Sequence, residues 1–374
     1  MPDSNNIPQK PCVEEGRVYP IAFDSVFFQY ISTGIARFWV SILTEWSSSG
    51  FICNLVILDR GGCAPYIDGA HYFSIPAHDY NNLEQDRKML DAACSLTKSK
   101  LFISSYYSHP GNVESLLVIY DMIPEVLGWE VTPPWEEKKL AIKHAKYFAA
   151  ISSNSAKDLT RFHSDIKFNE ICLTYCATSS EFFPKDDEKI HHFKMKYGIR
   201  RPYYILVGSD GGYKNIQLFY EAFKRLPNSE NYDVLRAVRG TSAFVSDFFR
   251  ECCYGSTIHS HIFEDFELAT AYSGAVSLIY PSQYEGFGMP PLEAMASGCP
   301  AIVCPNSSIP EVCGESAIYV PSDDPNALAA ELLKLQNNQY RVPFVKSGLE
   351  RAKLFNWAKS AKALSTKVLE CLKI

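Results

Sequence analysis

The 374-residue sequence lacks several features that mark common classes of protein. It has no apolar run near the roughly 20 residues that cross a bilayer, so any membrane contact is expected to be peripheral. Its formal net charge of −6 gives no basic excess, and no nucleic-acid partner is expected. No Cys-x-x-Cys pair occurs among the 12 cysteines, which excludes the usual zinc-ribbon and thiol redox motifs.

The cysteines and the start of the chain indicate a reducing compartment. Cysteines such as Cys53 in FICNLVIL and Cys304 in AIVCP stand within apolar runs, where a free thiol packs as a small hydrophobic side chain. The first residues, MPDSNNIPQK, are polar and show no signal-peptide pattern. We therefore expect a cytoplasmic protein, with any membrane contact at the inner face.

Length and hydrophobic patterning predict two α/β domains. A single core seldom serves more than about 250–300 residues, and 47% hydrophobic residues supply enough apolar material for two cores. Apolar runs alternate with helical patterns, which predicts parallel sheets covered on both faces. The predicted strands are VYPIAF, FICNLVIL, LFIS, SLLVIYD, YFAAIS and ICLTYC, then YYILVG, DVLRAV, AVSLIY, AIVCP and SAIYV. A charged segment at 181–200 separates the halves, so we place the boundary near Pro184, with domains at 1–185 and 186–356.

The most informative segment is residues 275–305, AVSLIYPSQYEGFGMPPLEAMASGCPAIVCP. AVSLIY predicts a buried strand, and Gly286 and Gly288 predict a sharp turn. Pro290 and Pro291 suit the first turn of a helix, which Gly298 then ends. The turn and the helix N-terminus therefore lie at the carboxyl end of a parallel strand, the edge where α/β sheets bind ligands.

Backbone and carboxylate groups in this turn favour a sugar diphosphate. We expect the N–H groups of Phe287, Gly288 and Met289 to face an anion such as a diphosphate. Glu285 precedes the turn and Glu293 is expected in the first turn of the helix; neither binds phosphate directly, but both can accept hydrogen bonds from sugar hydroxyls. Two alternatives stay open: Glu293 as a partner of the helix dipole, and Glu285 as an exposed loop acid.

This strand–loop–helix segment resembles the nucleotide-sugar site of the family-4 retaining glycosyltransferases, of GT-B fold. Their signature is two glutamates with seven residues between them around a Gly-Phe-Gly turn, which EGFGMPPLE matches with Glu285 and Glu293. The resemblance implies that Glu293 binds the donor ribose, Glu285 the transferred sugar, and the turn amides sugar and phosphate. It also implies two Rossmann-like domains facing across a cleft, the first binding acceptor and the second the nucleotide-sugar, with a last helix at 357–374 returning to the first.

A second matching segment, ILVGSDGGYKN, supplies a lysine. It resembles the first strand of the family's donor domain, which implies that Lys214 contacts the donor phosphates. A lysine just after a strand can neutralise charge on a leaving diphosphate. Tyr213 and Ser209 stand where the family often has an arginine, so the source of a second positive charge is open; Arg239 is one alternative, although a surface arginine is the simpler interpretation. The segment is not a P-loop, because Gly-Lys-Ser/Thr is absent.

Three N-terminal segments extend the resemblance. STGIARF resembles the family's glycine turn, which implies that Gly34 faces the donor phosphate. In VIYDMIPEV, Tyr120 replaces the family's histidine and Asp121 is kept, which implies that Asp121 orients sugar or acceptor. ISSNSAKDL, residues 151–159, resembles the family's serine-bearing turn into a helix and is interpreted as a helix cap and not as a catalytic element. The expected catalytic residues are Lys214, Glu285 and Asp121; the expected donor-binding residues are Gly34, Ser209, Lys214, Phe263, Glu285, Gly286, Phe287, Gly288, Met289 and Glu293.

The resemblance implies a retaining transfer of a hexose onto a glycan or lipid-linked glycan, with the departing phosphate oxygen taking the acceptor's proton. No Asp-x-Asp string is present, so neither a metal nor another cofactor is expected. Similarity to bacterial polysaccharide mannosyltransferases favours GDP-mannose as donor, ahead of UDP-glucose and UDP-N-acetylglucosamine. The alternatives are a nucleotide-sugar epimerase of the same fold, a non-catalytic sugar-nucleotide-binding protein, and a glycosidase, which needs two carboxylates facing each other roughly 5 to 9.5 Å apart.

Overall fold

The computed structural model describes residues 9–14, 16–30, 34–208, 212–238 and 247–373. The chain divides into two compact units: the first comprises Met1–Cys176 with Trp357–Ile374, and the second Ala177–Asn356. Each unit is built on its own parallel sheet, as the alternation of strands and helices predicts. In the part of the chain that is described, none of the helices is both long and apolar enough to cross a membrane.

The described residues of the first unit form a seven-stranded sheet in the order β3-β2-β1-β4-β5-β6-β7, with every neighbouring pair parallel. The order reverses direction between β1 and β4, as in doubly wound folds. β1 and β2 are buried along their whole length, because helices cover both faces of the sheet. The strands are β1 Ile21–Asp24, β2 Leu55–Arg60, β3 His71–Ile75, β4 Leu101–Ser104, β5 Glu114–Ile119, β6 Tyr147–Ala150 and β7 Cys172–Leu173.

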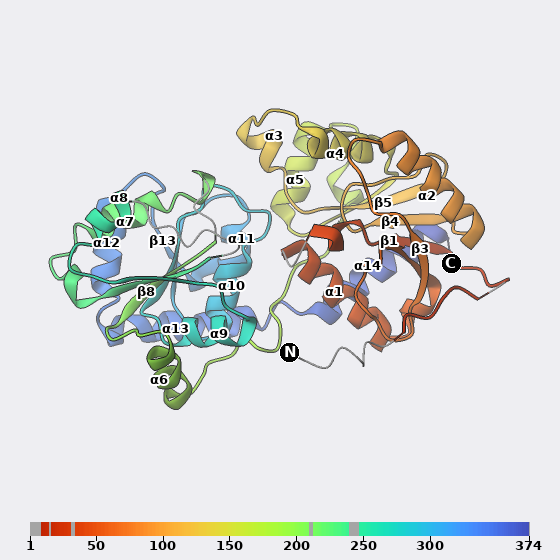
Figure 1. The fold of residues 1–374 in the computed structure, drawn as a ribbon. Helices are drawn as coiled ribbons and strands as arrows, with labels where there is room; N and C mark the ends of the chain where they lie inside the picture. The colour runs from red at the N-terminus through yellow and green to blue at the C-terminus, as the bar shows by residue number, and fades with distance from the viewer. Residues whose placement is uncertain (1–8, 15, 31–33, 209–211, 239–246, 374) are drawn as a thin grey trace. The chain divides into compact units, whose positions relative to one another are not determined.

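The last helix of the chain is part of the first unit. Its α-helices are α1 Gly34–Ser48, α2 Leu83–Thr97, α3 Ile123–Leu127, α4 Pro133–His144, α5 Ser153–Phe162 and α14 Trp357–Leu372. Figure 1 shows α14, in blue, beside α1, in red. The indole N–H of Trp46 in α1 donates to the carbonyl of Ala361 at 3.0 Å, and the rings of Phe38 and Trp357 lie 5.9 Å apart. Residues more than 300 positions apart in sequence therefore share one core.

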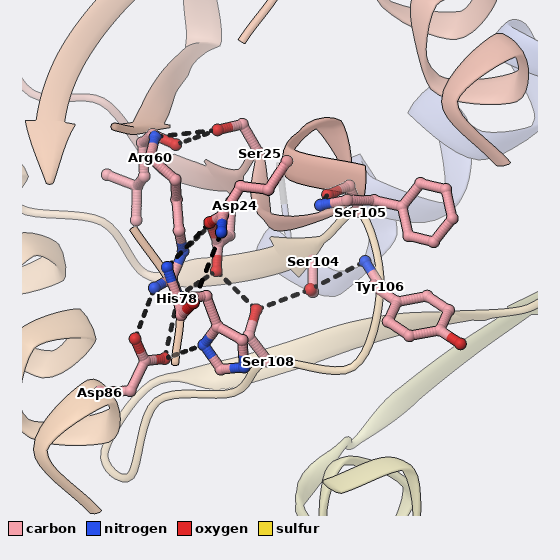
Figure 2. A network of polar contacts seen from close by, with 12 residues as sticks. Asp24, Ser25, Arg60, His78, Asp86, Ser104, Ser105, Tyr106 and Ser108 are labelled. Carbon is pink, nitrogen blue, oxygen red and sulfur yellow. Dashed lines mark hydrogen bonds and ion pairs between the residues drawn. The ribbon is translucent and has the colours of Figure 1, made fainter. Parts of the chain in front are cut away.

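A buried ionic network joins the carboxyl ends of β1 and β2 to α2 and α4 (Figure 2). The fully buried Arg60 guanidinium donates to Asp24 Oδ2 at 2.7 Å and to Asp86 Oδ2 at 2.9 Å. The ring of His78 lies 3.2 Å from a carboxylate oxygen of Asp86 on one side and of Glu137 on the other. Burial opposes charge on this imidazole, but the two carboxylates outweigh it and raise the pKa of His78 to about 9. His78 is therefore a cation at neutral pH.

The described residues of the second unit form a six-stranded parallel sheet in the order β10-β9-β8-β11-β12-β13. Its strands are β8 Tyr203–Val207, β9 Asp233–Ala237, β10 Ile258–His261, β11 Ser277–Tyr280, β12 Ala301–Val303 and β13 Ile318–Tyr319. Its α-helices are α6 Asp187–Lys196, α7 Gln217–Phe223, α8 Asp247–Cys252, α9 Asp265–Ser273, α10 Met289–Ala296, α11 Ile309–Cys313, α12 Pro325–Lys334 and α13 Asn338–Ala352. Because β8 and β11 are neighbours, the loops that follow them meet at the same edge.

The boundary between the units lies before the position expected from the sequence. The segment from Ala177 to Lys185, assigned above to the first domain, belongs to the second unit. The backbone N–H of Lys185 donates to Ser273 Oγ at 3.1 Å, and the Lys185 ammonium lies 4.7 Å from the centre of the Phe266 ring. These contacts with α9 hold the charged segment against the second unit, so the change in composition lies inside a domain.

Candidate functional site

The loop after β11 is a sharp turn that only glycine can make at its last position. Gly288 has φ +105°, a conformation that residues with a Cβ rarely adopt. A Cβ at Gly288 would also lie 2.7 Å from Cδ1 of Ile309. α10 begins at the next residue, Met289, with prolines in its first turn. The strand–turn–helix predicted for residues 275–298 is confirmed in type and order.

Hydrogen bonds from the segment before α11 fix the shape of this turn. The Ser308 hydroxyl donates to the carbonyl oxygens of Glu285 and Phe287, each at 2.8 Å. The backbone N–H of Glu285 donates to Ser307 Oγ at 2.7 Å. The Phe287 ring is buried and packs against Phe355 at 5.6 Å. These hydrogen bonds and the contact between Phe287 and Phe355 therefore hold the turn that carries Glu285 in place without a ligand.

Glu285 and Lys214 form an ion pair between the loops that follow β11 and β8. Lys214 is the last residue of a short 3₁₀ helix, Gly212–Lys214, and its Nζ lies 2.6 Å from Glu285 Oε1. Nζ also donates to the Tyr280 hydroxyl at 3.0 Å. The side chains of Lys214 and Glu285 are 15% and 11% exposed, so both keep access to solvent. The alternative that Glu285 is an exposed loop acid is wrong.

The surroundings of Lys214 keep it charged. Burial favours the neutral amine, but the Tyr280 hydroxyl and the Glu285 carboxylate offset this and raise the pKa of Lys214 above its ordinary value. Burial raises the pKa of Tyr280 well above its ordinary value, so this phenol stays neutral. The site therefore presents a fixed ammonium and a carboxylate side by side at the carboxyl edge of the sheet.

Glu293 lies deeper than its sequence position suggests. It is the fifth residue of α10, not part of the first turn as expected, because the helix begins at Met289 and its first turn holds no acid. The Glu293 residue is 2% exposed, and the Tyr272 hydroxyl donates to its Oε2 at 3.4 Å. The interpretation of Glu293 as a first-turn partner of the helix dipole is therefore wrong. Burial of a carboxylate costs free energy, and binding of a ligand at this edge of the sheet would account for it.

The other candidate residues of the second unit are Ser209, Arg239 and Phe263. Ser209 and Arg239 lie outside the described residues. Phe263 follows β10, whose carboxyl end is at the same edge of the sheet as those of β8 and β11. Its ring is half-buried and packs against Phe193 at 5.4 Å and Tyr197 at 5.0 Å.

In the first unit, Gly34 and Asp121 lie at helix starts. Gly34 is the first residue of α1; a Cβ there would meet nothing within 4 Å, so no described neighbour requires glycine. Asp121 follows β5, and its Oδ1 accepts from the backbone N–H of Ile123 at 3.0 Å. Tyr120 is a core residue whose hydroxyl donates to the Ser105 carbonyl at 2.8 Å. The capping role of the serine-bearing turn is confirmed, and the capping residue is Ser152, whose hydroxyl accepts from the N–H of Ser155 at 3.0 Å.

The chain is similar to known glycosyltransferases in sequence and to solved structures in fold. The family model described as "Glycosyl transferases group 1" matches residues 187–352. O-antigen chain mannosyltransferase B of Escherichia coli is 29% identical over 231 residues, 59% of this chain and 60% of that protein. The chain thus spans less than two thirds of the length of this curated relative.

Two solved structures resemble this chain in fold over nearly its whole length. Sucrose-phosphate synthase from Thermosynechococcus elongatus superposes with a TM-score of 0.75 at 20% identity, covering 95% of this chain and 99% of that one. HepE of Anabaena, in complex with UDP-glucose, superposes with a TM-score of 0.72 at 11% identity, covering 94% and 99%. At these identities the likeness concerns the fold alone. It confirms the predicted fold class, two Rossmann-like domains of the GT-B type.

Proposed function

We propose, from the match of residues 187–352 to the family model of group 1 glycosyl transferases, that the chain transfers mannose from GDP-mannose to a hydroxyl of a glycan or lipid-linked glycan. The observation that carries the proposal is the pair of Lys214 and Glu285, 2.6 Å apart at the carboxyl edge of the sheet. One ammonium suited to a diphosphate and one carboxylate suited to sugar hydroxyls are what a sugar diphosphate needs.

In this proposal, some residues of the second unit bind the diphosphate of the donor, and others bind its transferred sugar or its ribose. Lys214 neutralises the charge that grows on the diphosphate as the glycosidic bond breaks. Glu285 accepts hydrogen bonds from hydroxyls of the transferred sugar, and Glu293 from those of the ribose. The turn at residues 286–289 and the start of α10 direct backbone N–H groups to the sugar and phosphate. Contact of Gly34 with the donor phosphate and orientation of sugar or acceptor by Asp121 stay predictions from the sequence resemblance.

The proposed reaction retains the configuration of the anomeric carbon. The acceptor oxygen forms its bond to that carbon on the face from which the diphosphate departs, while the bond to the diphosphate breaks. The acceptor proton passes to the departing phosphate oxygen, so no protein nucleophile is required. Catalysis then consists of positioning and of stabilising the leaving group.

Mannose and guanosine are proposed because the E. coli relative is named a mannosyltransferase. HepE was solved with UDP-glucose, so uridine donors are the first competitors. Thermal unfolding should be followed with GDP, UDP, GDP-mannose, UDP-glucose and UDP-N-acetylglucosamine at equal concentrations. A ligand at 100 times its Kd stabilises by about 2.7 kcal/mol, so the preferred nucleotide should raise Tm by several degrees. A shift with UDP compounds alone would overturn the guanosine assignment.

Turnover separates transfer from the alternatives. Product from GDP-mannose and a mannose-terminated oligosaccharide should carry an α-linked mannose by NMR, with and without EDTA. Isomerised donor without acceptor would indicate an epimerase. Sugar release from an oligosaccharide without any nucleotide would indicate a glycosidase. Donor binding without turnover for every acceptor in a panel would indicate a non-catalytic sugar-nucleotide-binding protein.

A further inference from the structure

Lys214 must be held in one place to act on a leaving group, but its own side chain does not fix the ammonium. A lysine carries its charge on a flexible four-carbon stem, whereas stabilisation of developing charge requires groups that are already in position. Among the described residues the ammonium donates to two acceptors, Glu285 Oε1 at 2.6 Å and the Tyr280 hydroxyl at 3.0 Å. One of its three protons is therefore left for a ligand.

Glu285 is a partner that Lys214 has to share. In the proposed function the Glu285 carboxylate also accepts hydrogen bonds from hydroxyls of the transferred sugar, and these compete with Lys214 for the same oxygens. The Glu285 side chain lies on a loop and is 11% exposed, so a ligand can reach it. Once a donor is bound, the position of the ammonium therefore depends more on its other acceptor.

Tyr280 offers an acceptor that does not change when a donor binds. It is the last residue of β11, where it is the register partner of Val303 in β12, and it is 4% exposed. A closely packed ring at the end of a strand keeps one position, so the hydroxyl oxygen is fixed. Burial raises the pKa of Tyr280 well above its ordinary value. The phenol therefore stays neutral and does not cancel the charge of Lys214 as a second carboxylate would.

The ring of Tyr213 also contacts the ammonium. The centre of this ring lies 5.0 Å from Lys214 Nζ, within the range in which an aromatic ring attracts a cation. Tyr213 stands where the family often has an arginine, so in this chain the neighbour of Lys214 attracts the ammonium instead of repelling it. Both tyrosines hold the charge without neutralising it.

We propose that Tyr280 is a positioning residue of the donor site, whose hydroxyl holds the ammonium of Lys214 toward the diphosphate while Glu285 binds the transferred sugar. The proposal rests on the proposed function and deepens it, because it assigns a role to a residue that acts on the donor only through Lys214. No bond is made or broken on Tyr280, and its phenol keeps its proton throughout.

The test removes one oxygen atom from the site. Tyr280→Phe keeps the ring and deletes the hydroxyl. Tyr203→Phe is the matched control, because Tyr203 in β8 is also buried but its hydroxyl donates to the Ala271 carbonyl at 2.7 Å. Affinities for GDP and guanosine are measured by calorimetry, and kcat is measured with acceptor present. Should the wild type prefer UDP, UDP and uridine replace GDP and guanosine.

We expect Tyr280→Phe to weaken GDP binding about threefold, the net effect of one hydrogen bond, and to leave guanosine binding unchanged. Its kcat should fall about tenfold, because the position of Lys214 matters most when the leaving group gains charge. The Tyr203→Phe control should lower Tm but keep the wild-type GDP affinity and kcat.

Two double variants show whether Tyr280 acts through Lys214. In a Glu285→Ala background, Tyr280→Phe should weaken GDP binding at least tenfold, because it then removes the last acceptor of Lys214 among the described residues. In a Lys214→Met background, the same substitution should change neither GDP affinity nor kcat, because no ammonium is left to position.

Three results would overturn the proposal. The first is a folded Tyr280→Phe variant with the GDP affinity and kcat of the wild type. The second is an equal loss of affinity for GDP and guanosine, which would show that Tyr280 only supports the sheet. The third is a further loss of kcat in the Lys214→Met background. Should Tyr280→Phe not fold, Tyr280→Met also lacks the hydroxyl and is judged by the same comparison. A wild type that binds no nucleoside diphosphate would instead refute the proposed function, which keeps the two failures distinct.

Discussion

Replacing Lys214 by methionine should lower both Tm and kcat, and the two losses can be measured separately. Methionine keeps much of the aliphatic length of lysine and removes the charge. It leaves Glu285, 11% exposed, without its ion-pair partner. Loss of a partner from a mostly buried polar group costs about 1–3 kcal/mol of folding free energy. We therefore expect a folded variant with a Tm several degrees lower.

The catalytic loss should be larger than the structural one. A unit charge about 4 Å from another is worth about 4 kcal/mol at an effective dielectric constant near 20, and loss of one charge-stabilising donor in an enzyme costs about 2.7–4 kcal/mol. Lys214 shares its charge with Glu285, so we expect the lower end of that range. At about 1.4 kcal/mol for each factor of ten, kcat should fall by about 100-fold.

The assay is the release of nucleoside diphosphate in the presence of acceptor, with kcat and KM measured separately. Lys224→Met is the control, because Lys224 lies exposed at the end of α7. The double variant Lys214→Met/Glu285→Gln should regain much of the lost stability, since the glutamine needs no cation, but it should not regain activity. A folded Lys214→Met variant within tenfold of the wild-type kcat would refute the assignment of Lys214 to the leaving group.

Three further predictions address other parts of the chain. Glu293→Ala should lower the initial rate of transfer at least tenfold, about 1.4 kcal/mol. Glu315→Ala, which removes an exposed acid, is the control and should keep the wild-type rate. A wild-type rate in Glu293→Ala would show that Glu293 is not part of the site. Gly288→Ala should lower the free energy of unfolding in urea by about 1–2 kcal/mol for its left-handed backbone alone, and Ile309→Val, which removes the clashing Cδ1, should restore only the additional steric part. The stability contributed by His78 should be fully present below pH 6.5 and lost as pH rises through about 9, because its pKa is raised on folding. That loss is at most about 3 kcal/mol, and urea unfolding at pH 6, 8 and 9.5 should show it in the wild type and not in His78→Asn.

The central strands could be predicted from the sequence, and so could the edge strands β7 and β13, but the edge strands β3 and β10 could not. β1, β2, β8 and β11 are buried along nearly their whole length, so their sequences are continuous apolar runs. The predicted strands missed β3, HYFSI, and β10, IHSH, which are edge strands of their sheets. An edge strand is half-exposed and accepts polar residues, which leaves little hydrophobic pattern to detect.

The candidate site shows the same division between local and long-range information. The turn around Gly288 and the helix after it are local, so their residues predict them. The pairing of Lys214 with Glu285 depends on β8 and β11 being neighbours, which no local pattern states. The burial of Arg236 was not predicted, because this residue looks like a polar interruption in DVLRAV. An arginine inside an otherwise apolar strand was the available signal, and Arg60 in LVILDR is a second case.

The return of α14 to the first unit has a consequence for the order in which the protein is made. Residues 1–176 leave the ribosome before the second unit, whereas the helix that accepts the hydrogen bond from Trp46 is translated after it. Until then Trp46 and Phe38, which are buried in the finished protein, lack the partners supplied by residues 357–372. The second unit is continuous in sequence and can complete its core during synthesis. The first unit can therefore complete its core only after residues 357–372 have emerged, later than the second unit can complete its own.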